Sequence, residues 1–543
     1  MEALDWLVIG VFFLALIGII VWVVRQKQND SADYFLGGRD ATWLAIGASI
    51  FASNIGSEHL IGLAGAGASS GMAMAHWEIQ GWMILILGWV FVPFYSRSMV
   101  YTMPEFLERR YNPQSRTILS VISLVSYVLT KVAVTVYAGG LVFQQVFGIK
   151  ELWGIDFFWI AAIGLVVLTA LYTIFGGMKS VLYTSVLQTP ILLLGSLIIL
   201  VLGFKELGGW DEMMRVCGAV TVNDYGDTMT NLIRSNDDAN FPWLGALIGS
   251  AIIGFWYWCT DQFIVQRVLS GKNEKEARRG TIFGAYLKLL PVFLFLIPGM
   301  IAFALHQKYI GAGGEGFLPM LANGTANADA AFPTLVAKLL PAGVKGLVVC
   351  GILAALMSSL ASLFNSSAML FTIDFYKRFR PETPEKKLVG IGQIATVVIV
   401  ILGILWIPIM RSVGDVLYTY LQDVQSVLAP GIAAAFLLGI CWKRTSAQGG
   451  MWGLIAGMII GLTRLGAKVY YSNAGEVADS TFKYLFYDMN WLFFCGWMFL
   501  FCIIVVIVVS LATEAPTAEK IQGLVFGTAT KEQKAATRAS WDH

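Results

Sequence analysis

Residues 49–65 read SIFASNIGSEHLIGLAG, and this stretch decides the fold of the chain. It lies inside an apolar segment, yet it carries Asn54, Glu58 and His59, with Gly56 between them. Interrupted helices are tolerated at membrane depth only where protein buries them or where they line a wet cavity. A glycine kink for helix packing would explain Gly56 alone, but it leaves the three polar side chains without a reason. The stretch therefore predicts a broken membrane helix that lines a cavity.

The composition is that of an integral membrane protein. Of the 543 residues, 57% are hydrophobic and 13% are charged, whereas soluble domains carry about 25% charged residues. The net charge of +2 comes without a basic patch interleaved with aromatic residues, so nothing indicates a nucleic-acid partner. The six cysteines and four histidines are scattered, with no metal-ligand spacing and no nucleophile–base arrangement. We therefore expect a membrane protein that is not an enzyme.

Apolar stretches long enough to cross about 30 Å of hydrocarbon recur along the chain and predict about 13 transmembrane helices. They cover residues 5–25, 43–69, 73–98, 117–147, 155–175, 179–203, 241–265, 280–305, 342–376, 388–410, 415–440, 448–467 and 485–512. We expect residues 1–512 to form a single transmembrane domain and residues 513–543 a short, polar, loosely ordered tail. Lys and Arg are richer in one set of alternate loops, which places the N-terminus outside and the C-terminus in the cytoplasm.

A second span is interrupted at residues 249–262, which read GSAIIGFWYWCTDQ. Glycine-interrupted segments at corresponding places in two halves of a membrane protein point to inverted repeats with a binding site between them. Carbonyl groups freed at such breaks are suitable ligands for a small, hard cation such as Na⁺. Ser358 and Ser359, in LMSSLASLFNSSAML (356–370), would add two hydroxyl oxygens, although interhelical packing of small residues explains these serines equally well.

Charged residues within the apolar spans are candidate functional groups. Glu78 in HWEIQGW and Lys288 in GAYLKLLP have opposite charges, and either one alone would cost about 2.5–3.5 kcal/mol at the bilayer centre. We expect these two side chains to pair across a cavity. Asp261 lies near the end of its span, where a structural pairing beside Gln266 and Arg267 is at least as well supported as a contact with a substrate.

Convergent polar side chains next to aromatic planes are typical of a sugar site. Hydroxyl groups need paired donors and acceptors, and a missing partner in a buried site is heavily penalised. Tyr257 and Trp258 lie at the second break, Asn54 and His59 lie at the first, and Gln422 and Gln425 interrupt a further span. Anchoring at the membrane interface is the alternative for the two aromatic residues, but they lie several residues inside the span.

Five stretches of the chain resemble the sodium:solute symporter family, and within it the sodium/glucose cotransporters. They read FASNIGSEHLIGLAG, WYWCTDQFIVQR, GAYLKLLP, LMSSLASLFNSS and FLLGICWKR. The resemblance implies an all-α LeuT-type fold with two inverted five-helix repeats at about 43–203 and 241–440, an extra first helix at 5–25 and additional helices at about 448–512. It further implies a Na⁺-coupled symporter that imports a hexose, glucose and/or galactose, by alternating access.

The same resemblance assigns candidate site residues. The substrate site would comprise Asn54, His59, Glu78, Tyr257, Trp258, Lys288 and Gln422. The Na⁺ site would comprise the backbone carbonyls of Ala52, Ile55 and Ala355 with the hydroxyls of Ser358 and Ser359. Tyr257 would also be the inner gate and Tyr418 the outer gate. The partners would be a small-molecule sugar, the co-transported Na⁺ and the lipid bilayer of the cell membrane, with no obligatory protein partner.

Two positions depart from the family members that carry two sodium ions. Those members have an aspartate where Ser185 stands and a hydroxyl-bearing residue where Ala361 stands. Each change weakens a second cation site, because neither residue in this chain supplies a charged ligand. We therefore predict one Na⁺ per sugar.

Other functions stay open at this point. An inositol, a sialic acid or an amino acid such as proline would keep the transport mechanism, although Glu78 in the site disfavours substrates that carry a carboxylate. A sugar-sensing membrane receptor is the alternative from another class, but the residues after Leu511 are too few for an output domain. Glucose and galactose differ in the direction of one hydroxyl group, so the sequence does not rank them.

Overall fold

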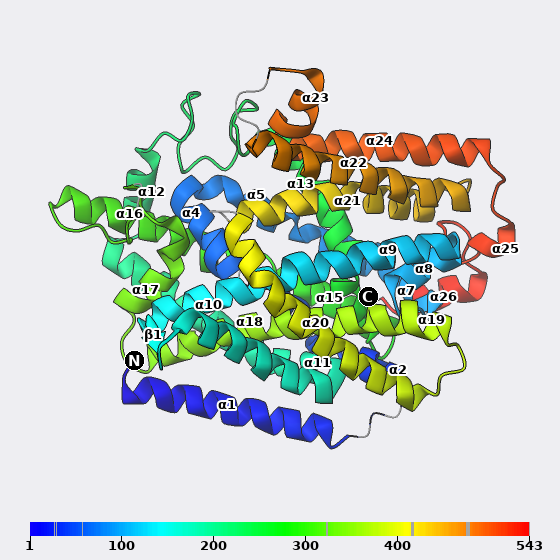
Figure 1. Cartoon of the computed structure of the whole chain (residues 1–543), viewed down its shortest axis with the longest axis horizontal. Coiled ribbons are helices and arrows are strands. Elements are labelled where there is room, and N and C mark those ends of the chain that lie inside the picture. The colour runs from blue at the N-terminus through cyan, green and yellow to red at the C-terminus, as the bar shows by residue number, and fades with distance from the viewer. Residues whose placement is uncertain are drawn as a thin grey trace.

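The computed structural model is almost entirely helical (Figure 1). It describes residues 1–541 apart from 27, 29, 57, 322–323, 414–416 and 474–477. For residues 129, 409–413, 417–423 and 472–473 it describes the backbone alone.

The first half of the chain consists of spans interrupted by short turns of tighter or wider helix, which are labelled η. Its elements are α1 (Ala3–Val24), α2 (Ser31–Leu36), η1 (Gly37–Arg39), α3 (Trp43–Asn54), η2 (Glu58–Leu63), α4 (Ala64–Ser70), η3 (Gly71–Met74), α5 (Ala75–Ile79), η4 (Gln80–Trp82), α6 (Met83–Ile86), η5 (Leu87–Phe91), α7 (Val92–Ser98), α8 (Met103–Arg110), α9 (Pro113–Ser126), η6 (Tyr127–Val132), α10 (Ala133–Phe147), the paired strands β1 (Glu151–Leu152) and β2 (Ile155–Asp156), α11 (Phe157–Leu207) and α12 (Trp210–Gly218).

The second half repeats the pattern of interrupted spans and ends in two short helices. Its elements are α13 (Trp243–Gly254), η7 (Phe255–Thr260), α14 (Gln262–Leu269), α15 (Glu274–Leu287), η8 (Val292–Leu296), α16 (Ile297–Gly311), η9 (Ala328–Ala330), α17 (Ala331–Leu339), α18 (Val344–Met369), η10 (Leu370–Tyr376), α19 (Lys377–Phe379), α20 (Glu385–Val413), α21 (Leu417–Cys441), α22 (Ala447–Asn473), α23 (Thr481–Lys483), η11 (Tyr484–Asp488), α24 (Trp491–Ala512), α25 (Ala518–Ile521) and α26 (Lys531–Ala539).

Eleven helices in the described part of the chain are long and apolar enough to cross a membrane. They accommodate the larger number of predicted spans because some hold more than one. α11 contains the spans predicted at 155–175 and 179–203, and its backbone turns at Gly177, where φ is +53°. The helical segment Glu58–Ser98 contains the end of the second predicted span and all of the third, with a turn at Gly71. The shorter helix α3 supplies the start of the second span.

The broken helix that starts with α3 lies in the core of the molecule. α3 packs against α11, α15 and α18, and α11 runs along α18. Gly195 lets α11 approach α18 closely, because a Cβ at this position would lie 3.3 Å from the Cα of Val348. Figure 1 shows α1 along one edge of the molecule and α24 along the opposite edge, where α24 packs with α21 and α22. Asn54, Ile55 and Gly56, at the first break, are therefore buried within the protein.

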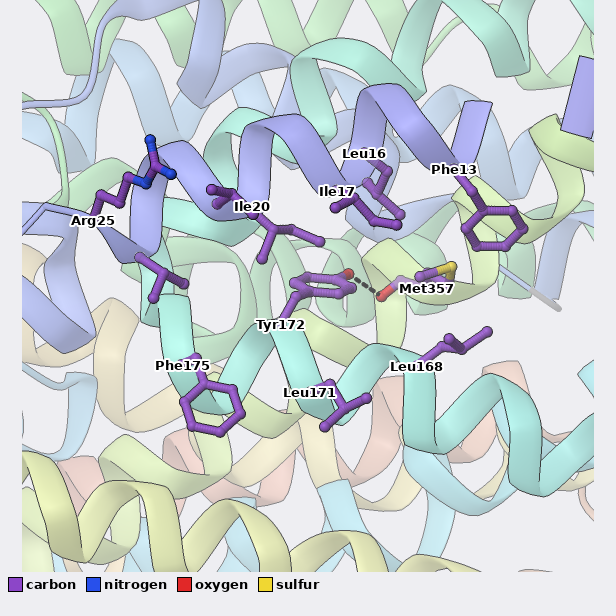
Figure 2. A pocket seen from close by; sticks show the side chains of 12 residues that line it. Phe13, Leu16, Ile17, Ile20, Arg25, Leu168, Leu171, Tyr172, Phe175 and Met357 are labelled. Atoms are coloured by element: carbon purple, nitrogen blue, oxygen red, sulfur yellow. Dashed lines mark hydrogen bonds between the residues drawn. The ribbon is translucent and has the colours of Figure 1, made fainter. Parts of the chain in front are cut away.

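An apolar groove lies on the outside of the molecule between α1 and α11 (Figure 2). Leu16, Ile20 and Tyr172 line it, and the Tyr172 hydroxyl donates a hydrogen bond of 3.0 Å to the carbonyl of Met357. Phe175 at its rim is 56% exposed. A groove of this composition suits contact with hydrocarbon and offers almost no polar group to a solute, so it is not the candidate site.

The tail after α24 folds back onto the ends of the transmembrane helices (Figure 1). Arg97 on α7 donates a hydrogen bond of 2.6 Å to the Thr537 hydroxyl of α26. The guanidinium of Arg278 on α15 lies 4.2 Å from the ring centroid of Trp541. The prediction of a loosely ordered tail is therefore wrong for its described residues, because side chains on α7 and α15 provide partners for it.

Candidate functional site

The first predicted break is present. α3 ends at Asn54, and Ile55 has an extended backbone with φ −77° and ψ 101°. The helix resumes at Glu58 as the wider turn η2. The carbonyl groups near the end of α3 are thereby freed from regular helical hydrogen bonding.

The second break has the same construction. α13 runs into the wide turn η7, and the helix stops at Asp261, whose backbone is extended with φ −75° and ψ 129°. The Asp261 carboxylate then caps the next helix, α14, by accepting a hydrogen bond of 3.2 Å from the N–H of Phe263. Tyr257 and Trp258 lie on η7, just before this stop.

The two breaks meet. The side-chain amide of Asn54 donates a hydrogen bond of 2.9 Å to the hydroxyl of Tyr257. Both residues line a small polar cavity whose lining residues are Asn54, Glu58, His59, Trp77, Glu78, Gln80, Ile253, Tyr257, Trp258, Lys288 and Gln425. Its volume of about 20 Å³ has room for little more than one water molecule. As described, the cavity is therefore too small for a solute and must widen to admit one.

Three titratable side chains form a compact cluster on one wall of this cavity. The Lys288 ammonium lies 2.6 Å from one Glu78 oxygen, and the His59 ring Nε2 lies 3.2 Å from the other. Lys288 also contacts His59 Nε2 at 2.6 Å. All three side chains are buried, and the pairing of Glu78 with Lys288 is the one that the sequence predicts. The charges of this pair compensate each other, so the wall carries little net charge while offering strong donors and acceptors.

Some polar atoms of the cavity have no partner. Among the side chains that the structure describes, Asn54 Oδ1, His59 Nδ1 and Gln80 Oε1 are buried without a hydrogen bond. Buried polar groups are normally paired, so unpaired atoms facing one cavity indicate contacts that a ligand or water completes. Tyr257 and Trp258 add two ring faces, with centroids 4.9 Å apart and planes at 83°.

The structure brings together most of the predicted substrate site. Six of its residues line the cavity: Asn54, His59, Glu78, Tyr257, Trp258 and Lys288. The side chains of Gln422 and Tyr418 lie outside the described part of the chain. Trp77, Gln80 and Gln425 are additional lining residues. Trp77 and Gln80 flank Glu78 in the same motif, and Gln425 follows Gln422 by one helical turn, so sequence neighbourhood is the signal that points to them.

A second cluster, rich in oxygen, lies beside the first break. The Ser359 hydroxyl on α18 donates hydrogen bonds to the carbonyls of Ser53, at 2.8 Å, and Ile55, at 3.4 Å. The Ser358 hydroxyl lies 3.2 Å from that of Ser185 on α11. Ala52 and Ala355, the other predicted ligands, are buried on the same two packed helices, α3 and α18. Neutral carbonyl and hydroxyl oxygens are the donors that Na⁺ accepts, so this set fits the ion.

A positive charge that sequence reasoning missed lies next to this cluster. Arg267 on α14 is fully buried, and its Nε donates to the hydroxyls of Ser49, at 3.1 Å, and Ser53, at 3.2 Å. Arg267 lies just beyond the span predicted at 241–265, so its burial becomes visible only in the fold. Ser185 and Ala361 are both buried nearby on α11 and α18, and neither supplies a negative charge.

Asp261 makes the structural pairing that the sequence indicates, but with other partners than its sequence neighbours. Its carboxylate pairs with the Lys131 ammonium at 2.8 Å and accepts a hydrogen bond from the Tyr127 hydroxyl. Both partners belong to η6, which sequence reasoning did not single out. A lysine in the middle of an apolar span is the signal that identifies it.

Comparisons with known proteins agree with this architecture. The chain matches the sodium:solute symporter family over residues 34–457. It is 37% identical to sodium/myo-inositol cotransporter 2 of Mus musculus over 542 residues, which cover 97% of this chain and 80% of that protein. It is 36% identical to sodium/glucose cotransporter 4 of Danio rerio over 537 residues, which cover 96% of this chain and 80% of that protein.

Solved structures resemble the fold. A Na⁺-coupled sialic acid symporter in a substrate-bound outward-open state superposes with a TM-score of 0.75 at 21% identity, over 95% of this chain and 99% of that one. MhsT in complex with L-phenylalanine superposes with a TM-score of 0.51 at 12% identity, over 90% and 100% of the two chains. The expected LeuT-type fold is thereby confirmed. The chain belongs to the sodium:solute symporter family, whose members couple the movement of a small solute across the membrane to Na⁺ and are not enzymes.

Proposed function

We propose that this protein imports a neutral, polyhydroxylated six-membered ring together with one Na⁺, by alternating access. The hexoses glucose and galactose are the substrates that the sequence favours. Myo-inositol is the second candidate, because a sodium/myo-inositol cotransporter is 37% identical to this chain. A sodium/glucose cotransporter is 36% identical to it. Both kinds of molecule present a ring of hydroxyl groups, and the cavity offers the donors and acceptors that such a ring needs.

One observation carries the proposal: Asn54 lies between Ser53 and Ile55, whose carbonyls both contact the candidate Na⁺ ligand Ser359. The carbonyls of Ser53 and Ile55 face the Ser359 hydroxyl, while the side chain of Asn54 faces the cavity beside Tyr257. A cation that orders these carbonyls also fixes Asn54 for the solute. The affinities of the ion and the solute are then coupled, and the coupling is reciprocal.

The charge of the cavity supports a neutral substrate. Glu78 and Lys288 are paired, and the described lining residues include no further charged pair that could hold a carboxylate and an ammonium at once. Amino acids and sialic acids are therefore less well matched than a polyol. Charged donors and acceptors bind hydroxyl groups through short, strong hydrogen bonds, so the pair can still contribute much of the affinity.

The surroundings of Ser185 support a ratio of one Na⁺ per solute. Its hydroxyl donates a hydrogen bond of 2.6 Å to the carbonyl of Val181, and the charged guanidinium of Arg267 lies in the same serine cluster. A second cation there would meet a positive charge and no carboxylate from the described side chains around it. One Na⁺ moving inward at −100 mV contributes about 2.3 kcal/mol before its concentration gradient is counted.

The proposal also covers the domain organisation, the orientation in the membrane and the gates. Residues 1–512 would form one transport domain, with repeats at about 43–203 and 241–440. The N-terminus would lie outside and the tail in the cytoplasm of a cell-membrane protein. Tyr257 would be the inner gate and Tyr418 the outer gate. Cysteine labelling from each side of the membrane tests this orientation.

Uptake in proteoliposomes tests the proposed function. The purified protein is reconstituted, and an inward Na⁺ gradient is compared with an equal K⁺ gradient for radiolabelled glucose, galactose and myo-inositol. We expect Na⁺-dependent accumulation of at least one, competition by the others, and a reversal potential that corresponds to one Na⁺. Uptake of none of them, or a solute bound without being transported as in a sensor, would overturn the proposal. A ratio of two would overturn the stoichiometry alone.

A further inference from the structure

The proposed function leaves one buried ion pair unused. Lys131 on η6 and Asp261 at the second break lie 2.8 Å apart, and their side chains are 5% and 2% exposed. The pair adjoins the cavity, because the Lys131 ammonium is also 4.4 Å from the ring centroid of the lining residue Tyr257. Tyr257 is the residue that closes the cavity against Asn54.

The surroundings of the pair fix both partners. The Tyr127 hydroxyl donates to the Asp261 carboxylate and accepts a hydrogen bond of 3.0 Å from the N–H of Phe263. The same N–H donates to Asp261, so the carboxylate holds the first turn of α14. The Lys131 ammonium also lies 4.8 Å from the ring centroid of Phe263, 5.1 Å from that of Tyr127 and 5.7 Å from that of Trp256. With Tyr257, four described aromatic rings therefore lie around it.

The pair joins two groups of helices. η6 packs mainly against α9, α10, α18 and α20, and it also touches α21. η7, which leads to Asp261, packs against α13, α21 and α6. Alternating access requires groups of helices to separate on one side of the solute while they close on the other. A contact across such a boundary must form and break in each cycle.

A buried ion pair is suited to this role. It adds little net stability when both partners are present, but either charge becomes costly once its partner is removed. The intact pair is therefore more favourable than a half-broken one. When the boundary opens fully, water replaces each partner. A partly open arrangement is disfavoured, which gives two discrete states.

α14 also contacts the candidate Na⁺ ligands. Arg267, two turns after the cap, donates to the hydroxyl of Ser53, and the carbonyl of Ser53 accepts the hydrogen bond of Ser359. One short helix is thus held by the ion pair at its first turn and by the serine cluster near its end. Occupancy of the Na⁺ site can therefore bias the ion pair.

We propose that Lys131 and Asp261 form the latch of the inner gate: they hold η7 so that Tyr257 closes the cavity, and they separate when the solute leaves toward the cytoplasm. This inference rests on the proposed alternating-access function. Lys131 and Asp261 act as positioning residues, because neither lines the cavity. Their loss affects the closure of the gate rather than the contacts with the solute.

Two readouts test the latch in reconstituted protein. The first is the leak of Na⁺ without solute, and the second is hydrogen–deuterium exchange of residues 255–270, which needs no substrate. For Lys131→Met and for Asp261→Asn, which keeps the cap acceptor, we expect both readouts to rise by about fivefold or more, the lower end of typical coupling factors. Lys131→Arg keeps the charge and should behave like the wild type. In the double variant, the leak and the exchange should be no greater than in the single variants, because no unpaired charge remains.

Lys288→Met is the matched control. It also removes the ammonium partner of a buried carboxylate, but that carboxylate, Glu78, belongs to the cavity wall and keeps its contact with His59. Solute KM should therefore rise without a leak or faster exchange at residues 255–270. Tyr127→Phe is the milder variant if a charge change prevents folding, and it should give a smaller rise. Unchanged leak and exchange in the folded variants would overturn the latch. If the wild type transports none of the solutes, the proposed function is contradicted instead. Hydrogen–deuterium exchange of residues 255–270 would still show whether the ion pair holds the gate.

Discussion

At the scale of single residues, the candidate Na⁺ site depends on oxygen atoms that carry no charge. The Ser359 hydroxyl reaches the carbonyls of Ser53 and Ile55, so it is the side chain that joins α18 to the first break. We expect Ser359→Ala to lower Na⁺-driven uptake by about tenfold or more, to the level seen with K⁺, since a ligand and the contact with the break are both lost. Ser367→Ala, on the same helix, is the control and should leave uptake unchanged. Full uptake by Ser359→Ala would remove this residue from the Na⁺ site.

Gln425 provides a test of the solute cavity at a residue that the family resemblance did not assign. Its side chain lines the cavity together with Lys288 and Trp258. Loss of one buried hydrogen-bond partner costs about 1–3 kcal/mol, so Gln425→Ala should raise the solute KM by about 5- to 150-fold. The Na⁺ concentration for half-maximal uptake should change little, because Gln425 lies on the solute cavity rather than in the oxygen cluster. Initial rates at varied solute measure the KM, and an unchanged value would contradict the role.

The sequence predicts which polar residues belong to the candidate site where these residues interrupt an apolar stretch. Asn54, His59 and Glu78 are conspicuous for that reason, and the structure places all three on one cavity. Lys131, within the span predicted at 117–147, carries the same kind of signal, but its role depends on a partner on a distant segment that no local pattern reveals. Arg267 follows the end of its predicted span and carries no such signal. A charge in a span predicts that a partner exists, and only the fold identifies it.

At the scale of elements, the turn within α11 depends on one glycine. Gly177 has φ +53°, and a Cβ there would collide with the carbonyl of Tyr34. Gly177→Ala should therefore destabilise the protein by about 1–3 kcal/mol. Gly164 is the matched control on the same helix, because a Cβ added there would have no atom within 4 Å and the backbone is ordinary helix. Thermal unfolding of the two variants in detergent measures the difference, and equal melting temperatures would contradict the argument.

The lengths of the apolar stretches predict the helical spans, but they do not predict the geometry of the connections between them. The sequence separates 155–175 from 179–203 correctly as two spans, and the structure joins them in one element because the chain turns at a single residue. The breaks at Asn54 and Asp261 are predictable, since polarity and glycine coincide there. The wide turn η6 does not combine glycine with several polar residues. Apart from Lys131, its residues are as apolar as their neighbours.

At the scale of the whole molecule, the tail ties several helices together. Trp541 lies against Arg278 on α15, and Thr537 accepts a hydrogen bond from Arg97 on α7. Trp541→Ala removes a cation–π contact of about 0.5–2 kcal/mol. Hydrogen–deuterium exchange at residues 531–541 should accelerate by about 2- to 30-fold, while exchange in α18 stays unchanged. Lys534→Ala, an exposed position on α26, is the control, and equal exchange in both variants would show that the tail is held by other contacts.

The order of the tail could not be predicted from its composition. Its residues are polar and its helices are short, which is typical of a loosely ordered segment. Its partners Arg97 and Arg278 lie on α7 and α15, and the surface that these helices form together exists only in the folded protein. Composition therefore predicts the transmembrane core well and the segments that dock onto it poorly.

Linkage between the two sites makes a prediction for the whole folded protein. A ligand that binds only the native state stabilises it by RT ln(1 + [L]/Kd), which is about 2.7 kcal/mol at a concentration of 100 Kd. Because Asn54 is flanked by carbonyls that face Ser359, Na⁺ should lower the Kd of the solute, and the solute should lower the Kd of Na⁺ by the same factor. Thermal unfolding with glucose or myo-inositol should thus shift the melting temperature more in Na⁺ than in K⁺ at equal ionic strength. Ser359→Ala should abolish this difference while keeping the small shift seen in K⁺. Equal shifts in the two salts for the wild type would mean that the ion and the solute bind independently, which would contradict the shared break as the origin of coupling.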